Sequence, residues 1–419
     1  MRLDRTGDAH EEALTMAYED TTTYRRTDEP TEPSAYRASS LAAAEQRRRA
    51  DEMEAIEAAD AQRVDDGRDR LGIHLGWEVV LLLAAAAFGF LLWQQDPDSL
   101  QRPGLDNLLV NGAAIGLLTL GAGLTLRAGV PNLALGPIAL AAALQYAEQG
   151  DQGLVKAAVP ALIVAAAGAV AIGLLVLVLH IPGWAATLAA ALGAIVYIQL
   201  RLEPVDVQGG YDPTDQAFFL FGGFALLAVI GGALGTITPV RRWLGRMRPV
   251  GDPAHRRGGA AVAPVLIALI LSSVFAVAAG FLLAAQSADP IVPGTGLEWT
   301  GIALGLAMVA GTSAYGRRGG IFGTLFAVVA LTLFLDWSDR KDLEIALFAT
   351  AAAVFGAGLI VTRLVETYGK PLTPATTVDD WNAAPTTATN WTPDLESWSP
   401  TTTTTTPNRW DAGPWGSNR

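Results

Sequence analysis

Long runs of apolar residues dominate the middle of this 419-residue chain, and polar residues dominate both of its ends. Between Ala157 and Leu179, and again between Ala260 and Ala288, no residue is charged. Each run is at least as long as the ~20 residues that a helix needs to cross the hydrocarbon core of a bilayer. Because backbone groups in that core must bond to one another, the runs predict membrane-spanning helices rather than open strands.

About ten such segments follow one another between residues 75 and 365, a region that we interpret as one transmembrane domain. Abundant Ala and Gly within it favour closely packed helices. The sequence therefore predicts an all-α membrane protein with about ten transmembrane helices. The predicted segments cover 76–94, 105–126, 130–147, 155–179, 182–200, 216–237, 260–286, 297–315, 319–337 and 343–363.

The two ends of the chain are predicted to be cytoplasmic tails without a core of their own. Residues 1–74 begin with a stretch rich in Thr, Glu, Asp and Pro, whose composition is typical of disorder. Opposite charges four apart then predict a solvated helix over 41–70, either a spacer or a docking helix for a partner. Residues 366–419 are rich in Thr, Pro and Trp and are predicted to be disordered. The tryptophans could bind a partner or the membrane interface, or the tail could have no specific partner.

Basic residues in the short loops predict the orientation of the helices, because such residues gather on the cytoplasmic side. The loop 238–259 holds six arginines and is expected inside, whereas the loop 201–215 holds four acids and one arginine and is expected outside. We therefore expect a multi-pass protein of the plasma membrane with both termini in the cytoplasm. One loop, 338–342, carries Arg340 and Lys341 on the side expected to be outside.

The amino-acid composition excludes several kinds of chemistry for this chain. With no cysteine and four scattered histidines, the chain offers neither thiol chemistry nor a metal-ligand pattern. The net charge of -12 comes mainly from the tails and outer loops, so it does not indicate a nucleic-acid partner. Neither a phosphate-binding loop nor a catalytic motif occurs. We therefore expect no catalytic residues, no cofactor and no metal, and any ATP would have to be hydrolysed by another protein.

The centres of the predicted helices hold amides, hydroxyls and glycines, while acids and bases lie near the helix ends. Ion-coupled transporters commonly place ionisable groups deep in the membrane, so this pattern favours an energy source outside the chain. Uncharged polar groups suit a neutral or zwitterionic solute. The candidate pathway residues are Asn111, Thr119, Asn132, Thr187, Gln199, Thr312 and Ser313.

One stretch, 129–140, reads "GVPNLALGPIAL" and interrupts an apolar run with an amide and two prolines. Proline restricts both its own backbone and that of the preceding residue, so a helix is expected to start or to break here. Asn132 would then either cap the orphan N–H groups of that helix or face a solute. The residues alone leave both interpretations open.

Three segments resemble the bacterial ABC-importer permeases for simple sugars, nucleosides and branched-chain amino acids. Residues 118–144, "LTLGAGLTLRAGVPNLALGPIALAAAL", resemble the second and third spans of those permeases. Residues 311–325, "GTSAYGRRGGIFGTL", match a glycine-rich run late in the sugar-type members, and 181–190, "IPGWAATLAA", resemble the start of their fifth span. The resemblance covers about 105–365.

This resemblance implies a type II ABC-importer fold with an internal, inverted repeat. It also implies a second permease chain, two ABC ATPase subunits and an extracellular solute-binding protein as partners. The substrate would be a simple sugar first, then a nucleoside or a branched-chain amino acid. The loop "VGDPAHRRGGAAV" partly matches the family's ATPase-coupling segment, and the residues assigned to that role are Arg241, Arg242, Arg246, Asp252, Arg256 and Arg257.

Two other functions remain as alternatives. Ten helices would permit an ion-coupled secondary transporter built from two five-helix repeats. The long tails and the partial match of the coupling segment would also suit a non-transporting membrane scaffold on a permease-like fold.

Overall fold

Helices make up most of the chain that the computed structural model describes, namely residues 48, 71–237, 240, 262–314, 316 and 320–368. The described residues belong to the first of two units, Met1–Pro371. Most of the segment 41–70, the six residues assigned to ATPase coupling and the tail beyond residue 368 lie outside the described residues, so the predictions about them stay predictions.

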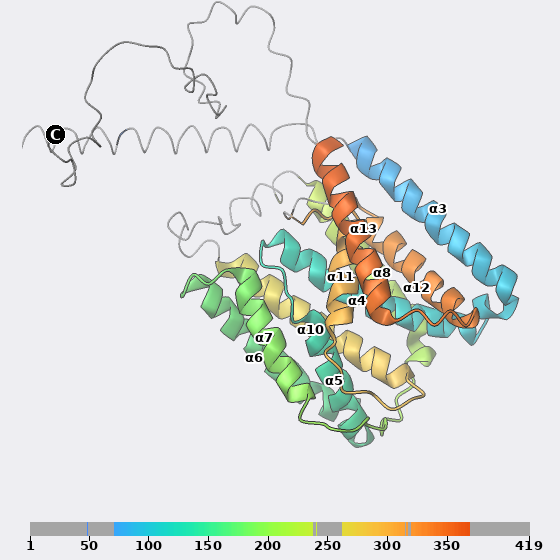
Figure 1. Ribbon diagram of the computed structural model, residues 1–419, viewed down its shortest axis with the longest axis horizontal. Helices are drawn as coiled ribbons and strands as arrows, with labels where there is room; N and C mark the ends of the chain where they lie inside the picture. The colour runs from blue at the N-terminus through green and yellow to red at the C-terminus, as the bar shows by residue number, and fades with distance from the viewer. Residues whose placement is uncertain are drawn as a thin grey trace, which may run out of the picture. The chain divides into compact units, whose positions relative to one another are not determined.

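Ten α-helices occur in the described part of the chain, one at each predicted segment, with three short 3-10 helices between them (Figure 1). They are α3 (Leu71–Gln95), η1 (Pro97–Leu100), α4 (Gly104–Arg127), α5 (Leu135–Gln149), η2 (Gly150–Gln152), α6 (Leu154–Leu177), α7 (Gly183–Ile198), η3 (Pro213–Gln216), α8 (Ala217–Thr236), α10 (Val262–Gln286), α11 (Leu297–Val309), α12 (Gly323–Arg340) and α13 (Leu347–Tyr368). Val205, after α7, and Ile291, after α10, pair in an isolated antiparallel β-bridge.

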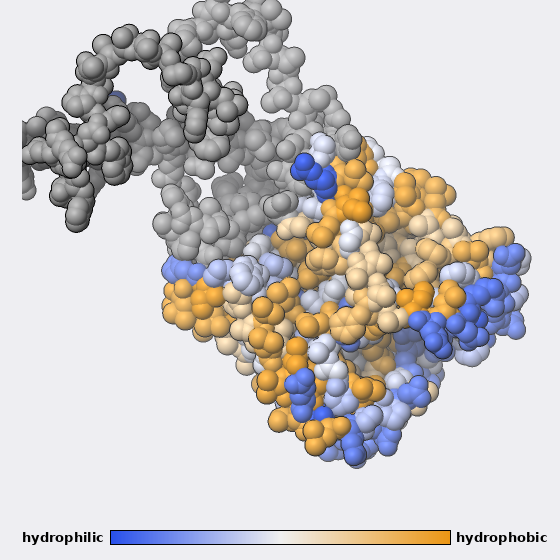
Figure 2. All heavy atoms as spheres, in the orientation of Figure 1, coloured by the Kyte–Doolittle hydropathy of each residue, from blue (hydrophilic) through white to orange (hydrophobic). Residues whose placement is uncertain are grey.

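Six of these helices, α3, α4, α6, α8, α10 and α13, are long and apolar enough to cross a membrane. Helices α7 and α11 are apolar but shorter. Large apolar side chains point away from the protein along the outer helices, for example Leu83, Val164 and Phe219, which are 64%, 71% and 84% exposed. Apolar surface also covers much of the face drawn in Figure 2. An apolar surface this extensive favours lipid over water, so the protein is an all-helical, membrane-embedded one.

Among the helix boundaries that differ from the prediction, two do so because α4 and α11 end in the same way. The N–H groups of Gly129 and Val130 bond back to the carbonyls of Leu126 and Thr125 at the end of α4. Gly311 and Thr312 do the same at the end of α11, and both glycines have a positive φ, 73° and 96°. This left-handed ending stops a helix. As a result α5 begins at 135 rather than 130, and α11 ends at 309 rather than 315.

Helices α4 and α10 form the centre of the bundle. Helix α10 packs against α4, α5 and α6, whereas α11 packs against α4, α5 and α13, and α12 packs mainly against α3. Most residues in the apolar windows of α4 and α10 are buried, whereas only 22–28% of those in α3, α6, α8 and α13 are. The central helices therefore have mostly protein neighbours.

Contacts between connecting segments sort them into two opposite ends of the bundle. At the first, which we call the Trp77 end, the Trp77 indole N–H donates to the carbonyl of Val309 at 2.7 Å, joining the start of α3 to the end of α11. At the second, the Arg201 end, Arg201 forms two bonds of 2.6 and 2.7 Å with Glu148, joining the segment after α7 to the end of α5. Successive segments of the chain therefore run up and down between the two ends.

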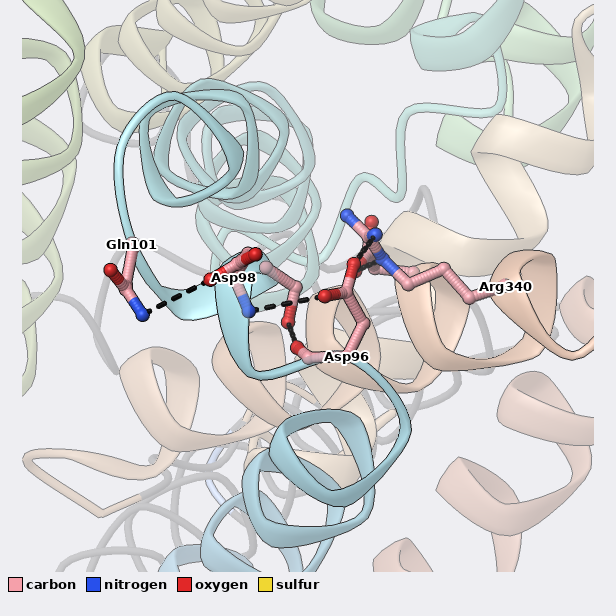
Figure 3. A network of polar contacts seen from close by, with 6 residues as sticks. Asp96, Asp98, Gln101 and Arg340 are labelled. Carbon is pink, nitrogen blue, oxygen red and sulfur yellow. Dashed lines mark hydrogen bonds and ion pairs between the residues drawn. The ribbon is translucent and has the colours of Figure 1, made fainter.

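Arg340, which contradicted the charge rule in the sequence, lies at the Arg201 end in a network of acids (Figure 3). Its Nη1 meets a carboxylate oxygen of Asp96, and its Nε donates to Asp336 at 2.8 Å. The other Asp96 oxygen accepts the N–H of Asp98 at 3.1 Å, which caps η1. Two carboxylates thus neutralise the basic residue and join the end of α3 to that of α12.

Candidate functional site

A non-helical segment, 128–134, lies inside the bundle between α4 and α5. Val130, Asn132 and Ala134 within it are 1%, 0% and 0% exposed. Backbone groups that leave a helix in an apolar interior need other partners, because each unpaired group is costly. The surrounding helices supply these partners through a set of hydroxyl groups.

Asn132 makes the central contacts of this segment. Its side-chain oxygen accepts the N–H of Ala134 at 3.0 Å, directly before α5 begins. Its side-chain nitrogen donates to the Ser272 hydroxyl on α10 at 2.9 Å, and that hydroxyl donates to the carbonyl of Leu269. Asn132 therefore both closes the turn before α5 and joins that turn to α10.

Three threonines hold the rest of the segment. On α4, the Thr125 hydroxyl accepts the backbone N–H of Asn132 at 3.3 Å. On α7, the Thr187 hydroxyl donates to the carbonyl of Pro131 at 2.8 Å. On α11, the Thr300 hydroxyl accepts the N–H of Gly136 at 2.9 Å and donates to the carbonyl of Leu133 at 3.1 Å. Four helices thus supply one hydroxyl each.

The segment 128–134 lies deep between the two ends of the bundle. Ser272, which Asn132 contacts, is the eleventh residue of the 25-residue α10. At 1.5 Å per residue it lies ~15 Å from the first residue of α10 and ~21 Å from the last. The segment 128–134 therefore lies beside the middle of α10, a helix that is long enough to cross a membrane.

Helices α5 and α11 start side by side at this depth and then diverge. A Cβ atom placed on Gly136 would collide with the carbonyl oxygen of Gly296, and one on Gly296 would lie 2.7 Å from that of Gly136. From there α5 follows α10, so that Ala139 touches Gly280, whereas the segment after α11 brings Gly316 against the end of α4. We call this meeting of two helix starts the α5–α11 junction.

A second cap stabilises the start of α12 at the Trp77 end. Oε1 of Glu78, on α3, accepts the N–H groups of Phe322 at 2.7 Å and Gly323 at 3.1 Å. Glu78 is 3% exposed, and a carboxylate is well placed at the positive end of a helix dipole. Neighbouring residues 77 and 78 of α3 thereby bind the end of α11 and the start of α12.

Of the seven residues predicted to line a pathway, the structure brings two to the segment 128–134: Asn132 lies within it, and the Thr187 hydroxyl donates to the carbonyl of Pro131. Thr119 is buried and donates to the carbonyl of Ile115 in its own helix, while Asn111 is half-buried in α4. The remaining three lie elsewhere: Thr312 and Ser313 are buried just after α11, and Gln199 is exposed after α7.

The residues that hold the junction from the neighbouring helices, Thr125, Ser272 and Thr300, were not predicted from the sequence. Neither were Trp77 and Glu78, which bond to α11 and α12 at the Trp77 end. Each is a single polar or amphipathic side chain in or beside an apolar helix. A single polar side chain in an apolar helix indicates a hydrogen bond to some backbone group, but the sequence does not identify which one.

Charged groups in the described residues gather at the Arg201 end. The hydrogen bonds to Glu148 hold the pKa of Arg201 above its ordinary value. Bonds from the hydroxyl and backbone N–H of Thr214 hold the pKa of the exposed Asp212 below its ordinary value. Within the described part of the chain, no group of three or more His, Cys, Asp or Glu residues could hold a metal ion.

Comparisons with known proteins found no relative of this chain. No family model matches the sequence, and searches of curated proteins and of solved structures found no match either.

Proposed function

We propose that this chain is the translocation subunit of a membrane transporter, an ABC-importer permease powered by a separate ATPase. The observation that carries the proposal is the α5–α11 junction. Two helices start at mid-depth and diverge toward opposite ends of the bundle, and hydroxyls from four helices hold the break. Interrupted helices at membrane depth are characteristic of transport proteins, in which irregular backbone lines a cavity or is covered by protein.

The packing of the helices supports an inverted repeat of α4–α7 and α10–α13. Helix α5 contacts α10, and α11 correspondingly contacts α4. Helix α5 also contacts α7 as α11 contacts α13, and α6 contacts α10 as α12 contacts α4. We propose that the two halves are related about the α5–α11 junction and that all ten helices lie in the membrane, with α5 and α11 each crossing only part of it and the Arg201 end outside.

The side chains that bond to the break favour an external energy source over ion coupling. The side chains that bond to the break are an amide and hydroxyls, whereas the buried Glu78 is occupied by the start of α12. A proton- or sodium-coupled carrier would place ionisable groups in such a site. The partners we propose are two ABC ATPases at the loop 238–259, an extracellular solute-binding protein and a second permease chain.

Uptake measurements test this proposal. Cells with and without the gene would be given radiolabelled D-ribose, inosine or L-leucine, in three separate assays. We expect gene-dependent uptake of one solute that stops when ATP is depleted and continues when a protonophore collapses the proton gradient. The Arg256→Glu/Arg257→Glu variant should lower both uptake and co-purification of an ATPase.

Two results would contradict the proposal in different ways. Uptake that fails with the protonophore and survives ATP depletion would show an ion-coupled carrier. Unchanged uptake of every solute, together with no co-purifying ATPase, would instead favour the membrane scaffold. A lysine-for-arginine variant at the same two positions keeps the charge and serves as the matched control.

A further inference from the structure

A hollow of about 230 Å³ lies between α5, α10 and the segment 287–299, on the side of the α5–α11 junction that faces the Arg201 end. Its wall is mostly apolar, with one side-chain hydroxyl, that of Ser287, and the indole of Trp299 near the start of α11. The other lining residues are Ala139, Leu140, Ala143, Gly280, Leu283, Ala284 and Ile291.

From this hollow we infer a binding site for a small solute that has an apolar body and one polar end. A buried apolar cavity of ~150 Å³ is large enough for benzene, so this hollow has room for a somewhat larger body. A polyhydroxylated sugar would leave most of its hydroxyl groups unpaired against alanine, leucine and glycine, at a cost for each. The Ser287 hydroxyl, which donates to the carbonyl of Asp289 at 2.7 Å, has lone pairs that can accept from the polar end of the solute.

One wall of the site is tied down by a single bridge, and we assign to that bridge the role of an outer gate. Val205 and Ile291 exchange two backbone hydrogen bonds of 3.0 and 2.8 Å, which hold the segment containing Ile291 against the segment after α7. Two bonds between isolated segments can open without disturbing a helix. Release of the bridge would widen the site toward the Arg201 end.

This inference rests on the proposed function, since it assigns the solute site and the gate of the same transporter, but its test measures binding rather than transport. The full chain would be labelled with 5-fluorotryptophan and placed in lipid nanodiscs. Cyclohexanol, with six carbons and one hydroxyl, serves as the probe, and D-ribose is the comparison. The ¹⁹F resonance of Trp299 is identified by its loss in Trp299→Phe.

We expect cyclohexanol to shift the Trp299 resonance in a saturable way and D-ribose to leave it unchanged. Ala143→Leu fills part of the site and should weaken the binding about tenfold or more. The matched change Ala141→Leu, on the same helix but outside the lining, should leave it unaltered. A shift that never saturates, or one that Ala143→Leu leaves intact in a folded protein, would overturn the site.

The gate is tested with a reversible cross-link, which the absence of native cysteines makes specific. Directly paired residues of two antiparallel strands that exchange both backbone bonds lie close enough for a disulfide. Oxidised Val205→Cys/Ile291→Cys should bind cyclohexanol at least about tenfold more slowly, and reduction should restore the rate; equal rates would overturn the gate. Binding without ATP-dependent uptake would refute the proposed transport function alone, whereas uptake without a Trp299 shift would refute only this site.

Discussion

The bond between Asn132 and Ser272 can be tested by removing each partner and then both. Asn132→Leu keeps the approximate volume but leaves the N–H of Ala134 and a Ser272 lone pair unpaired in the interior. A buried N–H without a partner costs roughly 1–3 kcal/mol, so we expect a loss of about 2 kcal/mol in the free energy of unfolding. Ser272→Ala leaves an N–H of the Asn132 amide unpaired and should cost about 1–2 kcal/mol.

The double variant distinguishes a specific bond from two independent losses. If the pair interacts directly, removing both partners costs less than the sum of the single changes, because no half of the bond remains unpaired. Interhelical bonds in membranes have coupling energies of about 0.6 kcal/mol on average and up to about 1.7 kcal/mol. We expect a coupling of about 1 kcal/mol here, since both side chains are fully buried.

The free energy of unfolding would be measured by SDS titration in mixed micelles, with far-UV circular dichroism as the readout. Asn111→Leu is the matched control, because it makes the same change at a half-buried position of α4. Combined with Ser272→Ala, it should be additive within ~0.5 kcal/mol. Additivity of the Asn132 and Ser272 changes as well would refute the reasoning. Transport by folded Asn132→Leu with unaltered substrate preference would assign Asn132 to capping rather than to solute contact.

Three further predictions follow from the same structure. Thr300→Val should lower the free energy of unfolding by about 1–3 kcal/mol, because the N–H of Gly136 loses its acceptor, whereas Thr300→Ser should restore most of it in the same titration. Gly136→Ala should abolish the monodisperse peak in size-exclusion chromatography, since the added Cβ collides with backbone across the junction, while Gly123→Ala, with open space around it, should be neutral or slightly stabilising. Thr214 lowers the pKa of Asp212, so the contribution of Asp212 to stability is present above its unfolded pKa of ~4 and is lost as the pH falls through the folded pKa. Thr214→Ala should therefore raise the Asp212 pKa measured by NMR. An unchanged pKa would contradict this.

The apolar pattern of the sequence located the helices well, because length and hydrophobicity are properties of the chain itself. Each of the ten predicted segments contains a helix of the described structure. The positions of the breaks were less predictable. The end of α4 was predicted at 126 and lies at 127, but α5 begins at 135, five residues later than expected.

The depth of the break could not be predicted from sequence, because it depends on which helix lies beside it. Asn132 precedes α5 and would be expected near a membrane surface if α5 spanned the whole bilayer. Instead Asn132 contacts Ser272 in the middle of α10, and the segment before α11 reaches the same depth from the other side. Hydrophobic periodicity records that a residue is buried, but not at which level of the bundle.

The reciprocal contact of Gly136 and Gly296 has a mechanical consequence. Two backbones touch there with no side chain between them, and densely packed interiors resist compression. The starts of α5 and α11 therefore cannot move closer, so a change in their relative tilt must pivot at the glycines. Because α5 has 15 residues and is ~22 Å long, a pivot of roughly 10° moves its far end by about 4 Å. The contact thus acts as a fulcrum, and a swing of either far end must carry or break the bonds that hold it, those of Arg201 to Glu148 on α5 and of Trp77 to Val309 on α11.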